Sequence, residues 1–196
     1  MPYIELLQYT GQYWSHALHR EVPWKMYAQK EYPEKLRYVL RDLAVKEGAF
    51  AYEYTGYLAN IHSVQSYYQA NIDMLESQKF YSLFSPNQKI YTKVKNEEPT
   101  YYANTSKVST SQFASGSIIE GEVVQSVLSR NIYVHKDSVV KDSILFPRVV
   151  IGQGAQVEYA ILDKGVEVAD GVVIRGTAEH PVVVKKGETV TEDIYS

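Results

Sequence analysis

Residues 123–139 read VVQSVLSRNIYVHKDSV, residues 140–156 read VKDSILFPRVVIGQGAQ and residues 157–173 read VEYAILDKGVEVADGVV, and these rows align without a gap. Aliphatic residues recur down three columns, namely Val123, Val140, Val157 and Ile174; Leu128, Leu145 and Leu162; and Val134, Ile151 and Val168. The columns are separated by steps of five, six and six residues. Because each step holds a short strand and a turn, three inward columns predict a triangular β-solenoid.

The pattern continues less regularly on both sides. Upstream, Val108, Phe113 and Ile119 predict an opening coil in which the step to Val123 is shortened. Downstream, Val182–Val184 is expected to close a stack of about four coils as a cap. One further column consists of the small residues Ser126, Ser143 and Ala160. Residues available for turns with positive φ are Gly152, Gly154, Gly165, Asp170 and Gly171. An antiparallel sandwich with alternating strands is the alternative to the solenoid.

Composition limits the function classes. The chain has 196 residues, 45% of them hydrophobic, and a formal net charge of -3. It is large enough for a core, and it lacks the general basic field that nucleic-acid binding needs. There is no cysteine and no apolar run long enough for a membrane span. We therefore expect a cytoplasmic protein with no nucleic-acid or membrane partner.

The first part of the chain has a different period. Apolar residues at helical spacing predict a helix over residues 35–46, and aromatic alternation predicts a strand over residues 49–57. Ser63 is a candidate N-cap for a helix whose apolar stripe is Val64, Tyr67, Tyr68, Met74 and Leu75. Residues 82–102 contain two prolines and short apolar stretches, which is typical of a connection.

The segment GYLANIHSVQSYYQANIDML, residues 56–75, resembles the end of the catalytic domain of ADP-glucose pyrophosphorylases, the glucose-1-phosphate adenylyltransferases. In that family a G-Y-W-x-D-x-G-T strand end precedes a helix reading S-Y-x-x-A-N-x-D-L, and a proline-containing linker and a left-handed parallel β-helix follow. Residues 100–103 and 117–121 resemble the family as well. The resemblance implies a nucleotidyltransferase remnant at residues 1–80, a linker at 81–105 and a left-handed β-helix at 106–196.

Departures from the family pattern indicate which member the chain resembles. Asn60 stands where the family has an aspartate that helps to hold Mg²⁺, and Leu58 replaces the tryptophan. A neutral amide holds a hard cation poorly, although Asn60 also suits a turn. With these changes the chain resembles the GlgD-type subunit of the family, which is regarded as regulatory. Mg²⁺ is implied for the parent enzyme, and no cofactor is expected in this chain.

The nucleotide loop, the E-K-P segment and the sugar-phosphate lysine of the family have no counterpart here. We therefore expect a C-terminal piece with no catalytic residue, inactive by itself. The resemblance implies a regulatory and oligomerisation module that packs against its own or a partner subunit's nucleotidyltransferase domain, in a homo- or hetero-oligomer. The parent reaction converts ATP and glucose 1-phosphate to ADP-glucose and pyrophosphate.

Candidate residues for binding a phosphorylated effector are the clustered cations Arg130, Arg148, Lys185 and Lys186. No metal site is expected, because His16 and His19 have no clear third ligand. The alternative function is a hexapeptide-repeat acyltransferase with His135 as its base. A scaffold without an effector site is a third hypothesis.

Overall fold

The computed structural model describes residues 12–15, 20–23, 46, 55–84, 90–91 and 95–196. The chain divides into two compact units, Met1–Thr55 and Gly56–Ser196. In the first unit, β1 (Gln12–Ser15) pairs with β2 (Arg20–Pro23) in an antiparallel ribbon. Apart from Lys46 and Thr55 to Tyr57, the helix and strand predicted over residues 35–57 lie outside the described residues, as do His16 and His19.

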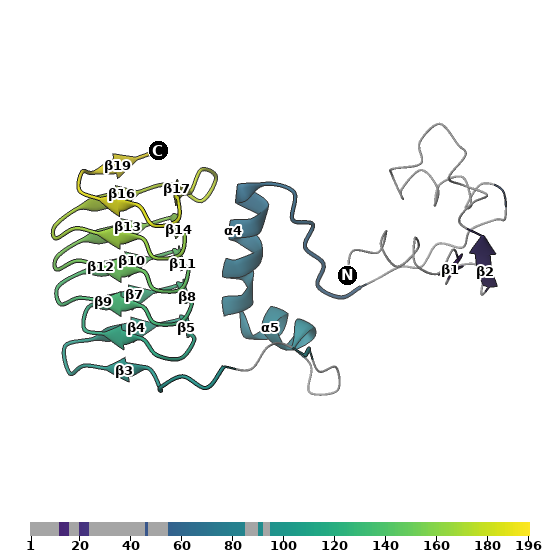
Figure 1. Cartoon of the computed structure of the whole chain (residues 1–196), viewed down its shortest axis with the longest axis horizontal. Coiled ribbons are helices and arrows are strands. Elements are labelled where there is room, and N and C mark those ends of the chain that lie inside the picture. The colour runs from purple at the N-terminus through teal and green to yellow at the C-terminus, as the bar shows by residue number, and fades with distance from the viewer. Residues whose placement is uncertain (1–11, 16–19, 24–45, 47–54, 85–89, 92–94) are drawn as a thin grey trace. The chain divides into compact units, whose positions relative to one another are not determined.

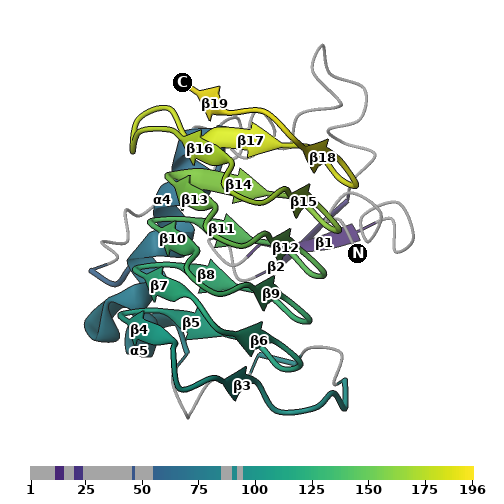
Figure 2. The same ribbon diagram turned by 90° about the vertical axis from the view of Figure 1, so that its left-hand side faces the viewer.

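The second unit is a stack of coils, and strands of successive coils pair in parallel to form three sheets (Figures 1 and 2). The first sheet consists of β4 (Lys107–Ser109), β7 (Glu122–Val124), β10 (Val139–Lys141), β13 (Gln156–Glu158), β16 (Val173–Arg175) and β19 (Ile194–Tyr195). The second consists of β5 (Gln112–Phe113), β8 (Val127–Leu128), β11 (Ile144–Leu145), β14 (Ala160–Leu162) and β17 (Val182–Val184). The third consists of β3 (Tyr101–Tyr102), β6 (Ile118–Ile119), β9 (Tyr133–Val134), β12 (Val150–Ile151), β15 (Glu167–Val168) and β18 (Thr189–Val190). This is a mainly β protein with a parallel β-solenoid, which excludes the antiparallel sandwich.

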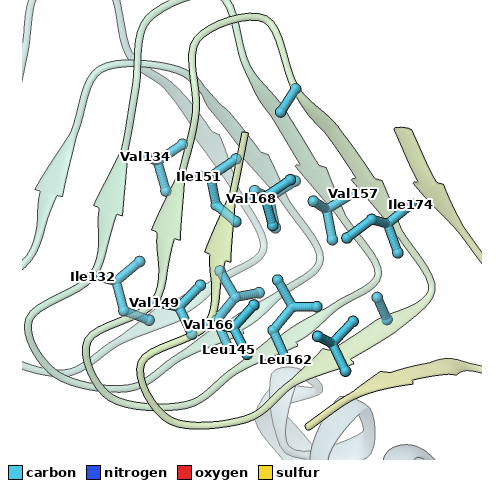
Figure 3. Packing of buried hydrophobic residues seen from close by; sticks show 14 of the residues in the cluster. Ile132, Val134, Leu145, Val149, Ile151, Val157, Leu162, Val166, Val168 and Ile174 are labelled. Atoms are coloured by element: carbon cyan, nitrogen blue, oxygen red, sulfur yellow. The ribbon is translucent and has the colours of Figure 1, made fainter. Parts of the chain in front are cut away.

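The register confirms the predicted columns. Val140 lies between Val123 and Val157, and Leu145 between Leu128 and Leu162. All residues of the three columns are buried, and they form one continuous core (Figure 3). Because each aliphatic residue lies on an aliphatic residue of the next coil, the apolar surface of both is removed from water.

The ends of the solenoid differ from expectation. Val184 pairs with Leu162, so β17 extends the second sheet as its last strand, and β18 and β19 follow it. Two sheets have six strands each, and the solenoid has about six turns rather than about four. The opening strand β3 lies within the range predicted as linker. The shortened step is confirmed, because Ile119 pairs with Val134 while Val123 pairs with Val140.

Positive φ angles recur at the corners between sheets. Three corner positions have positive φ in each of three successive rows: Gln125, Asp142 and Tyr159; Asn131, Arg148 and Gly165; and Asp137, Gly154 and Gly171. The prediction is confirmed for Gly154, Gly165 and Gly171 and wrong for Gly152 and Asp170. Gly152 is needed because the next coil passes close by: a Cβ there would lie 2.7 Å from the carbonyl carbon of Ala169.

The predicted column of small residues is a ladder of buried hydroxyls. Ser126 and Ser143 have no exposed surface, and the Ser143 Oγ donates to the Lys141 carbonyl at 2.7 Å. The same oxygen accepts from the backbone N–H of Ala160 at 3.1 Å. Ser126 Oγ accepts from the Ser143 N–H at 3.2 Å in the same way. The hydroxyls thus satisfy backbone groups that the corner would otherwise leave unpaired.

A helical segment packs on the second sheet. It comprises α4 (Val64–Ile72), the 3-10 helix η1 (Asp73–Leu75) and α5 (Ser77–Leu83), which the sequence analysis did not predict. Ser63 is the N-cap, as predicted, in a capping box with Ser66. In the described part of the chain, no helix has the length and apolar character that crossing a bilayer requires.

The predicted apolar stripe of α4 is only partly buried. Tyr68 packs against Ile144 and Ile161 and is 2% exposed, whereas Val64 is exposed. The Tyr68 hydroxyl donates to the backbone carbonyl of Asp142, at a corner of the solenoid, at 2.7 Å. Burial, with the nearby Asp142 and Tyr159, raises the pKa of Tyr68. The tyrosine is therefore the anchor of α4 on the solenoid.

Replacing Ser143 by alanine is expected to lower the free energy of unfolding by about 1–3 kcal/mol, because the Ala160 N–H loses its buried partner. Chemical denaturation followed by circular dichroism measures the change. Ser115→Ala, at an exposed corner position, is the control and should leave stability unchanged within about 0.5 kcal/mol. Equal effects of the two substitutions would contradict the role of the ladder.

Gly152→Ala is expected to cost about 3 kcal/mol, because the new methyl group meets the backbone of the next coil. Gly154→Ala should cost only about 1 kcal/mol, because that site has positive φ but open space around it. Thermal unfolding of the two variants compares them directly. The reverse order of stabilities would refute the close-approach explanation for Gly152.

Candidate functional site

The four cations proposed from the sequence lie on one corner of the solenoid, between the second and third sheets. The Arg148 N–H donates to the Arg130 carbonyl at 3.0 Å, which stacks the two arginines on successive coils. In the same column, Gly187 N–H donates to the Lys164 carbonyl at 3.0 Å, which brings Lys186 beside Lys164. We call Arg130, Arg148, Lys164, Lys185 and Lys186 the basic corner. Lys164 was missed, although its row position already indicated this corner.

Acidic groups offset part of this charge. Glu97 Oε2 lies 3.7 Å from Arg130 Nε. Asp163 accepts from the Lys164 backbone N–H at 2.7 Å, and Glu188 accepts from that of Lys185 at 3.2 Å. Arg148, Lys164, Lys185 and Lys186 are exposed. The excess of positive charge at this corner suits an anion with several charged oxygens.

A groove of about 560 Å³ lies between the N-terminal end of α4 and the second sheet, next to the basic corner. Its walls are mostly apolar, and Lys185, Asp163 and His62 supply polar groups. Its apolar lining residues are Ile61, Val64, Tyr67, Phe146, Ile161, Val183 and Val184. An anionic head on Lys185 with an apolar or sugar body in the groove is the binding mode that this geometry permits.

Asn60 lies in an exposed segment that leads into α4. Its backbone carbonyl oxygen is 3.0 Å from the ring atom His62 Nδ1. The backbone N–H of His62 donates to Ser66 Oγ at 3.0 Å. These contacts order the irregular segment that precedes the capped helix α4. No group of three or more His, Asp or Glu side chains placed to hold a metal ion occurs among the residues that the structure describes. Among the described residues, Asn60 therefore has no set of carboxylates beside it that could hold Mg²⁺.

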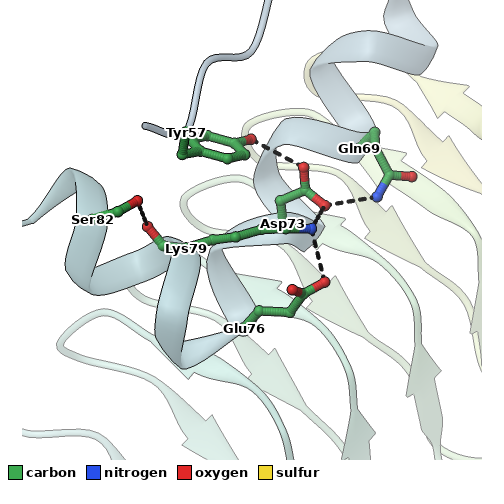
Figure 4. Close-up of polar contacts among 6 residues, drawn as sticks. All are labelled: Tyr57, Gln69, Asp73, Glu76, Lys79 and Ser82. Atoms are coloured by element: carbon green, nitrogen blue, oxygen red, sulfur yellow. Dashed lines mark hydrogen bonds and ion pairs between the residues drawn. The ribbon is translucent and has the colours of Figure 1, made fainter. Parts of the chain in front are cut away.

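A polar cluster around Asp73 holds this segment in place (Figure 4). Asp73 accepts hydrogen bonds from the Tyr57 hydroxyl and from Gln69 Nε2, both at 3.0 Å, and pairs with Lys79 Nζ at 2.9 Å. Lys79 also pairs with Glu76 at 2.8 Å. The cluster joins the irregular segment at Tyr57 to α4 and α5. Sequence reasoning missed it, because it depends on three segments meeting.

The cluster changes the titration of Asp73. Burial acts to raise the pKa of its carboxyl, but hydrogen bonds from Lys79, Gln69 and Tyr57 outweigh burial, and the pKa lies below its usual value. The carboxylate form is therefore the one that the folded state favours.

His135, the candidate acyltransferase base, lies at the corner between the third and first sheets. Its ring stacks on that of Tyr133 with the centroids 3.8 Å apart. Its backbone N–H donates to the Ile151 carbonyl at 3.0 Å. These are contacts of a residue that packs along the solenoid, and the structure does not bring His135 to the basic corner.

Comparison with known proteins identifies a matching family. The family described as GlmU-like, C-terminal hexapeptide matches residues 93–192. The glycogen biosynthesis protein GlgD of Bacillus subtilis is 40% identical over 153 residues, which cover 69% of this chain and 40% of that protein. The glucose-1-phosphate adenylyltransferase of Bacillus cytotoxicus is 35% identical over 140 residues, 71% of this chain and 37% of that protein. The chain thus spans about 40% of the length of these curated relatives.

Asp73→Asn is expected to lower the free energy of unfolding by about 1–2 kcal/mol at pH 7, because it weakens hydrogen bonds to a charged acceptor. Since the folded pKa lies below the unfolded one, the carboxylate's contribution is present above about pH 4 and is lost as the pH falls through the folded pKa. Urea denaturation at pH 7 and pH 3 should therefore show a smaller pH dependence for Asp73→Asn than for the wild type. Glu192→Gln, at an exposed site, should leave that dependence unchanged.

Proposed function

The chain belongs to the family of GlmU-like C-terminal hexapeptide domains, and from this premise we propose that it is the regulatory and oligomerisation module of a glucose-1-phosphate adenylyltransferase in glycogen biosynthesis. The observation that carries the proposal is its similarity to GlgD and to glucose-1-phosphate adenylyltransferase. The parent reaction would form ADP-glucose and pyrophosphate from ATP and glucose 1-phosphate. Such a module would work in the cytoplasm.

The helical segment is the proposed docking surface for a nucleotidyltransferase domain. Leu58 is 81% exposed, and Ile61, Val64 and Leu83 are exposed as well. A second groove of about 430 Å³, lined by Leu58, Ile61, Met74 and Leu83 among others, lies along α4. Apolar surface of this kind is typical of an interface whose partner is another domain. The parent nucleotidyltransferase domain, from the same or a partner subunit, is the partner proposed for it.

In this proposal the module contributes no catalytic residue. The aspartate that the resemblance implies for Mg²⁺ is replaced by Asn60, which lies in the irregular segment before α4. A phosphorylated sugar would instead bind at the basic corner, with Lys185 at the groove beside α4. Because Tyr68 anchors α4 on the solenoid and Asp73 joins α4 to the segment at Tyr57, binding there would be sensed by the segment that meets the parent domain.

Fructose 1,6-bisphosphate is the probe for this effector site. At about ten times its dissociation constant it should raise the melting temperature of the chain by about 2–4 °C, because it binds the folded state. Lys185→Ala combined with Lys186→Ala should abolish the shift. Differential scanning fluorimetry measures it, with glucose as the uncharged ligand control.

Lys107→Ala combined with Lys136→Ala removes two exposed lysines elsewhere on the solenoid and is the matched control. This variant should keep the full shift. An equal loss in both double variants would show a nonspecific charge effect and contradict the effector site. Formation of ADP-glucose by this chain alone would contradict a non-catalytic module.

A further inference from the structure

The helix α4 covers only part of the outward side of the second sheet, beside which it lies (Figure 1). Ile144 of β11 and Ile161 of β14 are buried, and Tyr68 of α4 packs against both. Val183 of β17 occupies the next outward position, because it pairs with Ile161. Its side chain is 50% exposed, so the cover is incomplete at this coil.

The groove of about 560 Å³ beside α4 has exposed aliphatic side chains on both of its walls. Val183 belongs to the solenoid wall, whereas Ile61 and Val64, 57% and 51% exposed, belong to the wall formed by the start of α4 and the segment before it. Covering such facing aliphatic surface with an apolar group is favourable. At roughly 30 Å³ for each water-sized group, the groove has room for a small head and one chain of about eight carbons, but not for the two long chains of a membrane lipid.

Cations gather along one edge of this groove, where the second sheet meets the basic corner. Lys185 lines the groove directly, and Lys164 and Lys186 lie next to it on the corner. The carboxylates of Asp163 and Glu188 accept hydrogen bonds from backbone N–H groups of this corner, whereas the three lysine side chains are exposed. An anionic head with several oxygens therefore suits this edge.

The interior of the groove suits an aliphatic chain better than a sugar ring or a nucleobase. The rings of Tyr67 and Phe146 stack on each other, with their centroids 6.4 Å apart. The ring atom His62 Nδ1 already lies 3.0 Å from the carbonyl oxygen of Asn60. The polar edges of a sugar or a base would thus lie mainly against aliphatic walls, and burying polar groups without partners costs free energy. An aliphatic chain has no such groups.

We propose that the groove binds a free phosphate ester that carries one aliphatic chain, with the phosphate on Lys185 and its neighbours and the chain between Val183 and Val64. This inference rests on the proposed effector site and adds a class of ligand to it. The ligand would also act on the proposed docking surface, because Ile61 and Tyr67 line both this groove and the second groove along α4. A chain that covers Ile61 changes the apolar surface offered to the parent domain.

The test compares the binding of n-octyl phosphate and ethyl phosphate to the whole chain by isothermal titration calorimetry. The octyl ester should bind at least about 30-fold more tightly, because each methylene group that the groove covers strengthens binding by up to about fourfold. Its heat-capacity change on binding should also be the more negative of the two. n-Octyl glucoside, which has the same chain and an uncharged head, should bind at least about tenfold more weakly than n-octyl phosphate.

Variants on the two walls locate the chain. Val183→Asn and Val64→Asn should each reduce the preference for the octyl ester to below about fivefold, because an amide replaces apolar surface. Ile118→Asn, at an aliphatic residue that is 40% exposed on the third sheet, is the matched control and should keep the preference. Lys185→Ala combined with Lys186→Ala should weaken the binding of both esters. Circular dichroism checks that each variant remains folded.

The other outcomes separate this inference from the proposed effector site. Equal affinity for the two esters, or an equal loss of preference in Ile118→Asn, would overturn the groove ligand, while a thermal shift with fructose 1,6-bisphosphate would leave the effector site intact. Failure of all three phosphates to bind would overturn both. Equally tight binding of n-octyl glucoside would overturn the role of the lysines. Binding to vesicles of dioleoylphosphatidic acid without binding of free n-octyl phosphate would overturn the choice of a free ligand over a membrane lipid.

Discussion

The interaction on which the structure depends is the parallel hydrogen bonding of each coil to the next, with paired residues seventeen apart in the regular rows. The backbone N–H of Val139 donates to the Ala155 carbonyl at 2.9 Å, and similar bonds recur on all three sheets. This pairing requires the strands of successive coils to keep the same residues facing inward, because a one-residue slip would turn an aliphatic column outward. The core, the serine ladder and the alignment of the corners all follow from that requirement.

This regularity explains how much of the fold could be predicted. Val123, Val140 and Val157 stand in one column of the sequence because they touch in the structure. An alignment of the seventeen-residue rows does not indicate contacts between the solenoid and segments that lack this repeat. The Asp73 cluster, the anchor from Tyr68 to Asp142 and the short helix α5 join parts that share no repeat, so no spacing indicates them.

The candidate site was predictable to a similar degree. Residues that connect the second sheet to the third fall on one corner in every coil, and this brings Arg130, Arg148 and Lys186 together. Lys164 belongs with them by the same rule. Gly152 shows the limit of residue type as a guide: glycine permits positive φ, but here it is needed for the approach of Ala169 and Asp170. Only coordinates distinguish these two uses of glycine.

Departures from the repeat carry the features that a scaffold alone would not need. Ten residues separate Ile174 from Val184, whereas five separate Val157 from Leu162, so the last strand of the second sheet follows an inserted loop. At the other end, the shortened step sets Gly121 close beneath Ser138, where a Cβ would lie 2.6 Å from the Ser138 carbonyl oxygen. A uniform stack would place charges and apolar residues equally along its length. Because these deviations lie at opposite ends, the two ends of the solenoid differ in the geometry of their corners.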